Sequence, residues 1–328
     1  MTSGESWFDG ALPVSRTQGF LVVLGAGTMF SFGPLTFRAV VEADEWQYLF
    51  HRAFWTGVVA ALVIALGGRN PVRAIRAAGG RQLVAGLLLG TLFGMFVVAL
   101  SRVTAAFILL LQCTSPFYAA LMARLFLGEK VGRRTFLAMS VAAAGVLLMV
   151  GGNIGGGDPL GIGLAMILPV CLGAYTVLVR SSPAEDPGAP TVVAGFFAAT
   201  VAGLISLFGP GLALPARDVL MGFVGGGLLL GLGVPMWNYA HRFVPVAEVN
   251  LLLITEVVLA PVWLWIWPGE RPSSTTLIGG GIALAAVTWL TVVTARAGEM
   301  ERAPRRIGLH AGAAPGYRRF VSQRNGGR

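Results

Sequence analysis

Charged residues, cysteines and histidines are all scarce in this 328-residue chain. Asp, Glu, Lys and Arg make up 12% of it, against roughly 25% in soluble domains, and the mean hydropathy is +0.74. Such a composition excludes a protein that faces water over most of its surface. The two cysteines, Cys113 and Cys171, and the three histidines, His51, His241 and His310, show no metal-ligand or nucleophile spacing. We expect no metal, no cofactor and no enzymatic activity, and we assign the cysteines no role.

In place of charge, the chain has a series of apolar windows of about 20 residues. As a helix, such a window crosses the roughly 30 Å hydrocarbon layer of a bilayer. No window alternates apolar and polar residues as a membrane β-strand does. The predicted fold class is therefore an all-α integral membrane protein. Ten transmembrane helices are predicted, at 18–37, 46–66, 82–101, 104–126, 135–152, 160–180, 190–209, 218–240, 246–267 and 276–295.

The basic residues predict the orientation of these helices, because short cytoplasmic loops retain Lys and Arg. Most of the 24 basic residues lie in the loop with Arg69–Arg81, in the loop with Arg124–Arg134 and in the tail 296–328. All three segments share one side of the membrane, and we expect both termini in the cytoplasm. The net charge of +9 follows from this bias and requires no nucleic-acid partner. The Arg-, Ala- and Gly-rich composition indicates a bacterial inner (plasma) membrane.

The two ends of the chain carry little further information. The first residues include Glu5 and Asp9 and no cationic stretch, so we expect the first helix to be retained and not cleaved as a signal peptide. The basic tail is predicted to be disordered, although it could also lie on anionic lipid.

The pentapeptide GLLLG occurs twice, at Gly86–Gly90 and at Gly227–Gly231. When the chain is shifted by 141 residues against itself, the match continues without a gap to Gly128–Glu129 on Gly269–Glu270. The second half is therefore predicted to repeat the first. Because one period holds five helices, an odd number, the second copy is inverted in the membrane, as in many secondary transporters. The predicted units are a first five-helix repeat at 1–152, a second at 153–295 and the cytoplasmic tail at 296–328.

Two long segments carry a resemblance to a known family. They read SPFYAALMARLFLGEKVGRRTFLAMSVAAAGVLLMV at Ser115–Val150 and WNYAHRFVPVAEVNLLLITEVVLAPVWLWIWPGE at Trp237–Glu270. In order and spacing they resemble the EamA-type branch of the drug/metabolite transporter superfamily. The resemblance implies a 5+5 helical fold that moves small organic solutes by alternating access. Where the family has Glu-Pro in the second half, this chain has Glu256 followed by valine, with a proline only at Pro261, so we expect the kink of the ninth helix to be displaced.

Charges inside the hydrocarbon are the first candidates for a solute site, because they are expensive to bury. Glu256, near the middle of the ninth helix, is predicted to couple transport to protons or to anchor a substrate amine; a structural hydrogen bond is the alternative. Arg52 in the second helix could hold an anionic group, although a structural pair with Glu42, Asp44 or Glu45 is expected. His51 is a further ionisable group, with a structural role as its alternative. Glu248 is expected to face the membrane interface.

Neutral polar and aromatic side chains complete the predicted solute site. Each could contact solute, although a hydrogen bond between helices is the alternative for the polar ones. They are Gln112, Tyr175, Asn238, Asn250, Phe30, Phe93, Trp237 and Tyr239. Gly33–Pro34 and Pro169 are expected to interrupt their helices beside the cavity. Trp263, Trp265 and Trp267 are expected to form an interfacial belt.

These observations predict a secondary transporter, an exporter of amino acids or related metabolites, with possible proton coupling. One alternative is a channel or a lipid scramblase, which would share the apolar bundle; another is efflux of drugs or organic cations. The expected partners are a small-molecule solute and membrane lipid, and the protein is expected to be a monomer or a weak homodimer.

Overall fold

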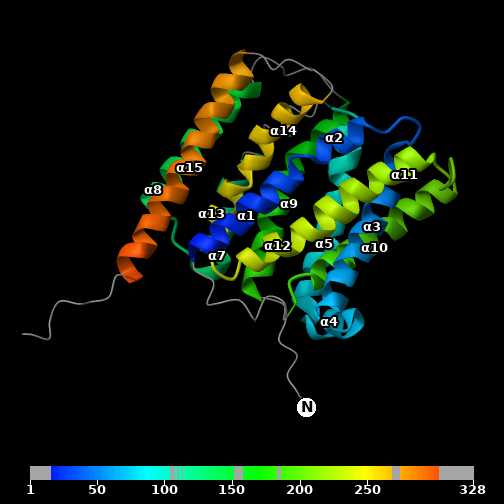
Figure 1. Ribbon diagram of the computed structural model, residues 1–328, viewed down its shortest axis with the longest axis horizontal. Helices are drawn as coiled ribbons and strands as arrows, with labels where there is room; N and C mark the ends of the chain where they lie inside the picture. Colours follow the sequence, from blue (N-terminus) through cyan, green and yellow to red (C-terminus); the bar gives the residue numbers. More distant parts are fainter. Residues whose placement is uncertain are drawn as a thin grey trace, which may run out of the picture.

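The computed structural model describes residues 16–103, 108, 111–112, 114–150, 158–182, 186–267 and 274–302. Over these residues the chain forms helices, turns and bends, and no β-strand (Figure 1). The helices of the first half are α1 (Arg16–Phe30), α2 (Gly33–Arg38), α3 (Glu45–Leu66), α4 (Pro71–Ala77), α5 (Gly79–Leu100), α7 (Ser115–Leu127) and α8 (Arg133–Val150). Those of the second half are α9 (Pro159–Ser181), α10 (Ala189–Leu207), α11 (Ala216–Gly222), the π-helix η1 (Phe223–Leu230), α12 (Gly231–Ala240), α13 (Val246–Leu252), α14 (Ile254–Ile266) and α15 (Ser274–Arg302).

The predicted membrane helices coincide with observed helices wherever the structure describes them. Six helical segments are long and apolar enough to cross a membrane: Thr17–Arg38, Glu45–Leu66, Gly79–Leu100, Pro159–Ser181, Ala189–Leu207 and Ala216–Ala240. The protein is thus an all-helical, multi-pass membrane protein, while ten crossings remain a prediction. Cys113, most of the first part of the fourth predicted helix, and the tail beyond Arg302 lie outside the described residues.

Local sequence signals fix several helix ends. Asp44 accepts hydrogen bonds from the backbone N–H groups of Trp46 and Gln47 (2.9 and 2.7 Å), and Gln47 Oε1 accepts one from Asp44 N (3.2 Å). This reciprocal capping box satisfies N–H groups that the first turn of α3 leaves free. At the end of α7, Gly128 adopts a left-handed φ of 68°, which glycine tolerates without strain and which stops the helix.

Breaks in the long helices fall only partly where the sequence predicts them. The first membrane helix is interrupted before Gly33, between α1 and α2, as expected. The expected interruption at Pro169 is wrong, because α9 continues through it from Pro159 to Ser181; a proline removes one N–H donor, and helices packed around it can tolerate this loss. The ninth helix divides at Leu253, three residues before Glu256, and α14 then continues across Pro261.

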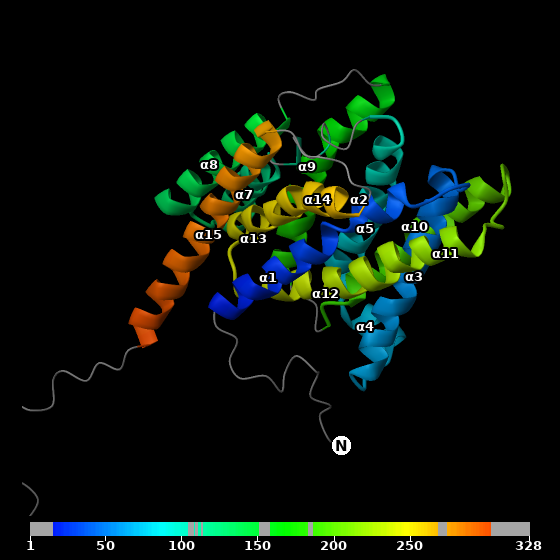
Figure 2. The ribbon, with the colours of Figure 1, turned by 45° about the horizontal axis from the view of Figure 1, so that its top comes forward.

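The helices pack in pairs that are related by an exchange of the two halves. In Figures 1 and 2, α8 lies beside α15 at one side of the molecule, and α3 lies beside α10 towards the other. Between them, α5 packs on α9 and α10, while α12 packs on α1 and η1 on α3. The contacts of α5 with α9 and α10 correspond to those of α12 with α1 and of η1 with α3, once each first-half helix is exchanged for its second-half counterpart.

The duplicated glycines lie at these paired contacts. A Cβ atom at Gly86 would approach Pro190 O of α10 to 2.9 Å, and one at Gly231 would approach Thr56 O of α3 to 3.3 Å. Both copies of GLLLG therefore let a helix of one half approach a helix of the other half closely, as small residues do in membrane bundles.

Candidate solute-binding cavity

A cavity of about 110 Å³ lies inside the bundle and is lined by both halves of the chain. Its walls are mainly aliphatic and aromatic, with three polar side chains among them, a composition typical of small-molecule sites. The polar side chains are Arg52 from α3, Gln112 and Glu256 from α14. The remaining lining residues are Phe30, Gly33, Pro34, Leu89, Leu92, Phe93, Phe96, Leu168, Leu172, Gly225, Leu229, Leu230, Val234, Trp237 and Leu253.

Aromatic rings surround the cavity from three helices. Phe30 of α1 meets Trp237 of α12 edge to face, with ring centroids 6.3 Å apart. Phe93 and Phe96 of α5 lie one helical turn apart and both face the guanidinium of Arg52, at 5.7 and 5.9 Å from its central carbon. The rings thus provide flat apolar walls, and two of them stabilise a cation through their π faces.

Arg52 is buried, with 7% of its side chain exposed. The expected pair with Glu42, Asp44 or Glu45 is wrong, since Asp44 caps α3 and Glu45 pairs with Arg102. Over the described part of the chain, neither Nε nor Nη1 of Arg52 has a hydrogen-bond acceptor. A buried guanidinium in that condition carries a large desolvation cost, so these donors are available to a ligand that enters the cavity.

Glu256 faces the same cavity from the opposite half of the chain. It lies in the first turn of α14, directly after the break at Leu253, and its partly buried carboxylate has no hydrogen bond or ion pair to any residue that the structure describes. Glu256 and Arg52 line the same cavity, and no salt bridge joins them in the described part of the chain. The cavity therefore presents one guanidinium and one carboxyl group to its contents.

Other predicted site residues lie outside the cavity lining and bond to neighbouring helices. Tyr175 donates a hydrogen bond to Asn238 Oδ1 (2.6 Å), and Asn238 Nδ2 donates to Pro187 O (3.0 Å). Asn250 Nδ2 donates to Thr176 Oγ1 of α9 (3.3 Å) and, within its own helix, to Val246 O (3.0 Å). These contacts correspond to the interhelical alternative for the polar residues, although Tyr175 also packs against Trp237, with ring centroids 5.1 Å apart.

Two further predicted residues make their contacts outside the cavity lining. Tyr239 packs against Phe243 with ring centroids 5.2 Å apart. His51 approaches Leu212 O at 3.2 Å. Neither side chain is among those that line the cavity.

Sequence reasoning missed several lining residues, notably Phe96 and Gly225. Phe96 follows Phe93 by one turn, so helical spacing would have placed both on one face. Gly225 belongs to η1, and no feature of the hydrophobic pattern marks a π-helix, which often accompanies functional sites.

Polar contacts join the two halves at one end of the bundle, which we call the Glu129 end. Arg180 Nε donates to Glu129 Oε1 (3.0 Å), and Glu129 Oε2 accepts from Val246 N (3.2 Å). Thr135 donates to Glu248 (3.0 Å), which is buried with 5% exposed. The expectation that Glu248 faces the membrane interface is therefore wrong, because this hydrogen bond stabilises the carboxylate between helices.

At the opposite end, the Arg102 end, further contacts join the halves. Asp218 accepts hydrogen bonds from the backbone N–H groups of residues 41, 42 and 43, at 3.0, 2.9 and 3.0 Å. Trp263 stacks on Phe32 with centroids 4.5 Å apart and donates to Ser31 (2.6 Å). Trp263 is thus a packed residue rather than part of the expected belt, whereas Trp265 and Trp267 are exposed.

Comparison with known families agrees with this architecture. A model of the EamA-like transporter family matches residues 17–151 and again residues 159–292. The chain belongs to the EamA-like transporter family. The two matches correspond to the two halves that exchange in the packing pattern.

Curated relatives of this chain are named as bacterial transporters. YdfC of Bacillus subtilis (strain 168), an uncharacterized transporter, is 28% identical over 202 residues, which cover 58% of this chain and 64% of the relative. An uncharacterized transporter of Vibrio cholerae is 28% identical over 169 residues, covering 49% and 53%. The riboflavin transporter of Rhizobium johnstonii is 28% identical over 183 residues, covering 54% and 58%. The matched segments span less than two thirds of each relative's own length.

The fold of this chain is also present among solved structures. One crystal structure superimposes with a TM-score of 0.71, covers 86% of this chain and 99% of its own, and is 19% identical in sequence. This similarity concerns the fold alone.

Proposed function

We propose that this EamA-like transporter is a secondary transporter that exports a small amphipathic solute, an amino acid or a related metabolite, by alternating access. The observation that carries the proposal is the pair formed by Arg52 and Glu256, which face one aromatic-lined cavity from different halves of the chain. If the halves rock against each other, the two groups separate or approach, and the solute between them is released or held.

The chemistry of the cavity favours a solute with both an acceptor and a donor group. The unpartnered donors of Arg52 suit a carboxylate, and charge-assisted hydrogen bonds of this kind are stronger than neutral ones. Glu256 suits an ammonium group or, when the solute lacks one, a proton. We therefore assign substrate recognition to Arg52 and proton coupling or amine binding to Glu256, with Gln112, Phe30, Phe93 and Trp237 as further solute contacts.

A planar heterocycle is a second candidate substrate class. Aromatic walls on three sides favour a flat ring system, and one relative is named a riboflavin transporter. A ring edge that offers carbonyl oxygens and an N–H group would engage Arg52 and Glu256 in the same way as a zwitterion.

The test is transport in proteoliposomes. A thermal-shift screen of amino acids and riboflavin selects the solute, and flux of that radiolabelled solute is then measured with and without an imposed pH gradient. Glu256→Gln removes the charge and keeps the shape, so we expect flux to fall about tenfold or more and its dependence on the gradient to disappear. Glu42→Gln, an exposed change in the loop before α3, is the matched control. Unchanged flux of Glu256→Gln under every gradient would exclude the assignment.

The same vesicles separate the alternatives. A carrier saturates and supports counterflow, whereas a channel gives flux that does not saturate and a scramblase moves labelled lipid. Efflux of organic cations is disfavoured by the guanidinium of Arg52 in the cavity, and competition by a quaternary ammonium probe would detect it.

A further inference from the structure

A second cavity, of about 400 Å³, lies away from the central one, among α3, α5, α9 and α10. Its walls are almost entirely apolar, and several of its lining residues, including Thr91, Leu160 and Val201, are exposed on the outside of the bundle. We call it the side groove. Gly94 forms part of its floor: a Cβ atom there would meet only Leu49 Cδ2, at 3.7 Å. The groove therefore exists partly because α5 has no side chain at this position.

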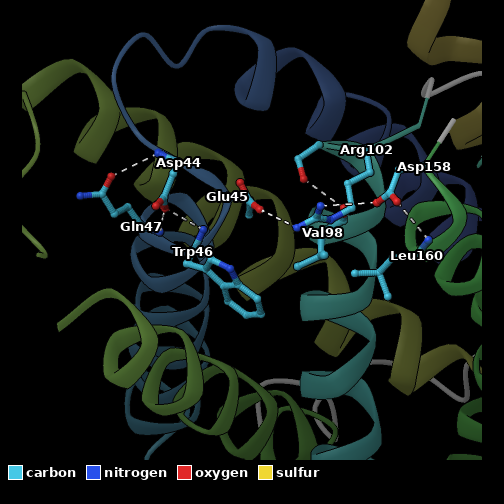
Figure 3. Close-up of polar contacts among 9 residues, drawn as sticks. Asp44, Glu45, Trp46, Gln47, Val98, Arg102, Asp158 and Leu160 are labelled. Carbon is cyan, nitrogen blue, oxygen red and sulfur yellow. Dashed lines mark hydrogen bonds and ion pairs between the residues drawn. The ribbon is translucent and has the colours of Figure 1, made fainter. Parts of the chain in front are cut away.

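One end of the side groove adjoins a cluster of three charged groups (Figure 3). Arg102 Nη2 lies 3.3 Å from Glu45 Oε1, and Arg102 Nη1 lies 3.4 Å from Asp158 Oδ2. The groove residues Trp46, Val98 and Leu160 lie within about one helical turn of these three in sequence, and Figure 3 shows them in the same region. The apolar groove and the charged cluster thus form one continuous surface.

The charged cluster is open to further ligands. The side chains of Arg102, Glu45 and Asp158 are 34%, 24% and 42% exposed. The two ion pairs are long and use two of the five donors of the guanidinium. One cation between two carboxylates carries a net charge of about −1, which is complementary to an ammonium group placed beside a phosphate.

The dimensions match one leaflet of a bilayer. From Gly90, at the deep end of the groove, to Leu100, at the end of α5, the helix is about 15 Å long, which is half of the roughly 30 Å hydrocarbon thickness. Arg102 lies just beyond that end, at the level of the lipid headgroups. Trp46 lies beside it, a residue type that is frequent at this level.

We infer that the side groove binds one phosphatidylethanolamine-type phospholipid, independently of the transported solute. An acyl chain lies in the groove over Gly94. The phosphate accepts hydrogen bonds from Arg102, and the primary ammonium donates to Glu45 and Asp158. Phosphatidylcholine has no N–H donor for the two carboxylates, and phosphatidylglycerol has no cationic group to neutralise them, so both bind more weakly.

The test measures lipid binding by native mass spectrometry of the purified, delipidated full chain. An equimolar mixture of phosphatidylethanolamine, phosphatidylcholine and phosphatidylglycerol with identical acyl chains is added. We expect one phosphatidylethanolamine per chain, bound about tenfold tighter than either competitor. Asp158→Asn keeps a good helix cap but loses the charge, and is expected to reduce the preference for phosphatidylethanolamine to about the level of phosphatidylcholine. Glu45→Gln tests the same contact if the first variant does not fold.

The acyl chain is tested separately. Gly94→Leu fills the groove and is expected to abolish binding of all three lipids at this site, while Gly281→Leu, on the open face of α15, is the matched control and retains it. Equal binding of phosphatidylethanolamine and phosphatidylcholine to the unaltered chain would refute headgroup recognition. Unchanged binding to Gly94→Leu, or a dimer that this variant alone dissociates, would refute the lipid as occupant of the groove.

Discussion

Arg52 lies about two turns after the start of α3, and its guanidinium group lies over the rings of Phe93 and Phe96 without a salt bridge to a carboxylate in the described structure. Two of its nitrogens have no acceptor within the described structure, so a solute carboxylate or carbonyl would replace hydrogen bonds that burial has removed. Arg52→Gln shortens the side chain and removes the charge. We expect KM to rise about tenfold or more, because a hydrogen bond to a charged group contributes about 1.5–3 kcal/mol.

Uptake at varied solute concentration in proteoliposomes measures that KM. Arg52→Lys keeps the charge without the planar donor geometry and is expected to give an intermediate KM. Arg76→Gln in α4 is the control, since this side chain is exposed and no residue of α4 lines the cavity. An Arg52→Gln protein whose KM equals that of the unaltered chain would show that the guanidinium does not contact solute.

At the residue scale, the sequence predicts which side chains face the cavity better than it predicts which residues they contact. Arg52 and Glu256 stand out because charges in apolar helices are rare, and both face the cavity. The partner of Arg52 was mispredicted because Glu45, although nearby in the chain, points to the end of the helix and pairs with Arg102 from α5. Such a choice depends on which helices become neighbours, and the local pattern of α3 does not contain that information.

At the scale of the helices, α3 and α10 approach each other closely along their length. A Cβ atom at Gly195 would lie 2.6 Å from Gly57 Cα and 2.8 Å from Ala53 O, so backbone would have to move. We expect Gly195→Ala to destabilise the protein by about 1–3 kcal/mol, the usual cost of overpacking. Thermal unfolding in detergent measures the change. Gly281→Ala, with open space around it, should leave the midpoint nearly unchanged, and equal midpoints for both variants would contradict this packing.

The positions of the helices were largely predictable from the sequence, whereas their irregularities were not. Apolar length decides where a helix can lie in a bilayer. The predicted and observed ranges agree within a few residues over the described chain, except that α15 continues seven residues beyond the predicted end at 295. Gly33–Pro34 carried a local signal for a break, since proline lacks an N–H donor. Leu253 carries no such signal, and η1 depends on close contact with α3, where a Cβ atom at Gly226 would collide with the backbone of Arg52. Tertiary packing therefore sets these two features.

At the scale of the whole molecule, the order of the contacts along α3 and α10 gives their relative direction, which the predicted inversion of the two halves requires to be antiparallel. Gly188, Gly195 and Gly203 along α10 and the loop before it approach Ile64, Gly57 and Phe50 in turn, so the two helices are antiparallel. They are the second helix of each predicted repeat, and equivalent helices that run antiparallel are what inverted repeats require. The sequence predicted this relation because a gapless repeat of an odd number of helices allows no other orientation in a membrane.

The inversion also predicts where equivalent residues lie relative to the bilayer. Arg133 begins α8, Ser274 begins α15, and the repeat offset relates them; both are exposed. Single cysteines at Arg133 and at Ser274, in a chain whose Cys113 and Cys171 are replaced by alanine, should therefore react with a membrane-impermeant maleimide from opposite sides. With basic loops inside, the cysteine at 274 is labelled in intact cells and the one at 133 only after permeabilisation. If both react from the same side, the two halves are not inverted, and an exchange of their conformations could not move a central cavity from one face of the membrane to the other.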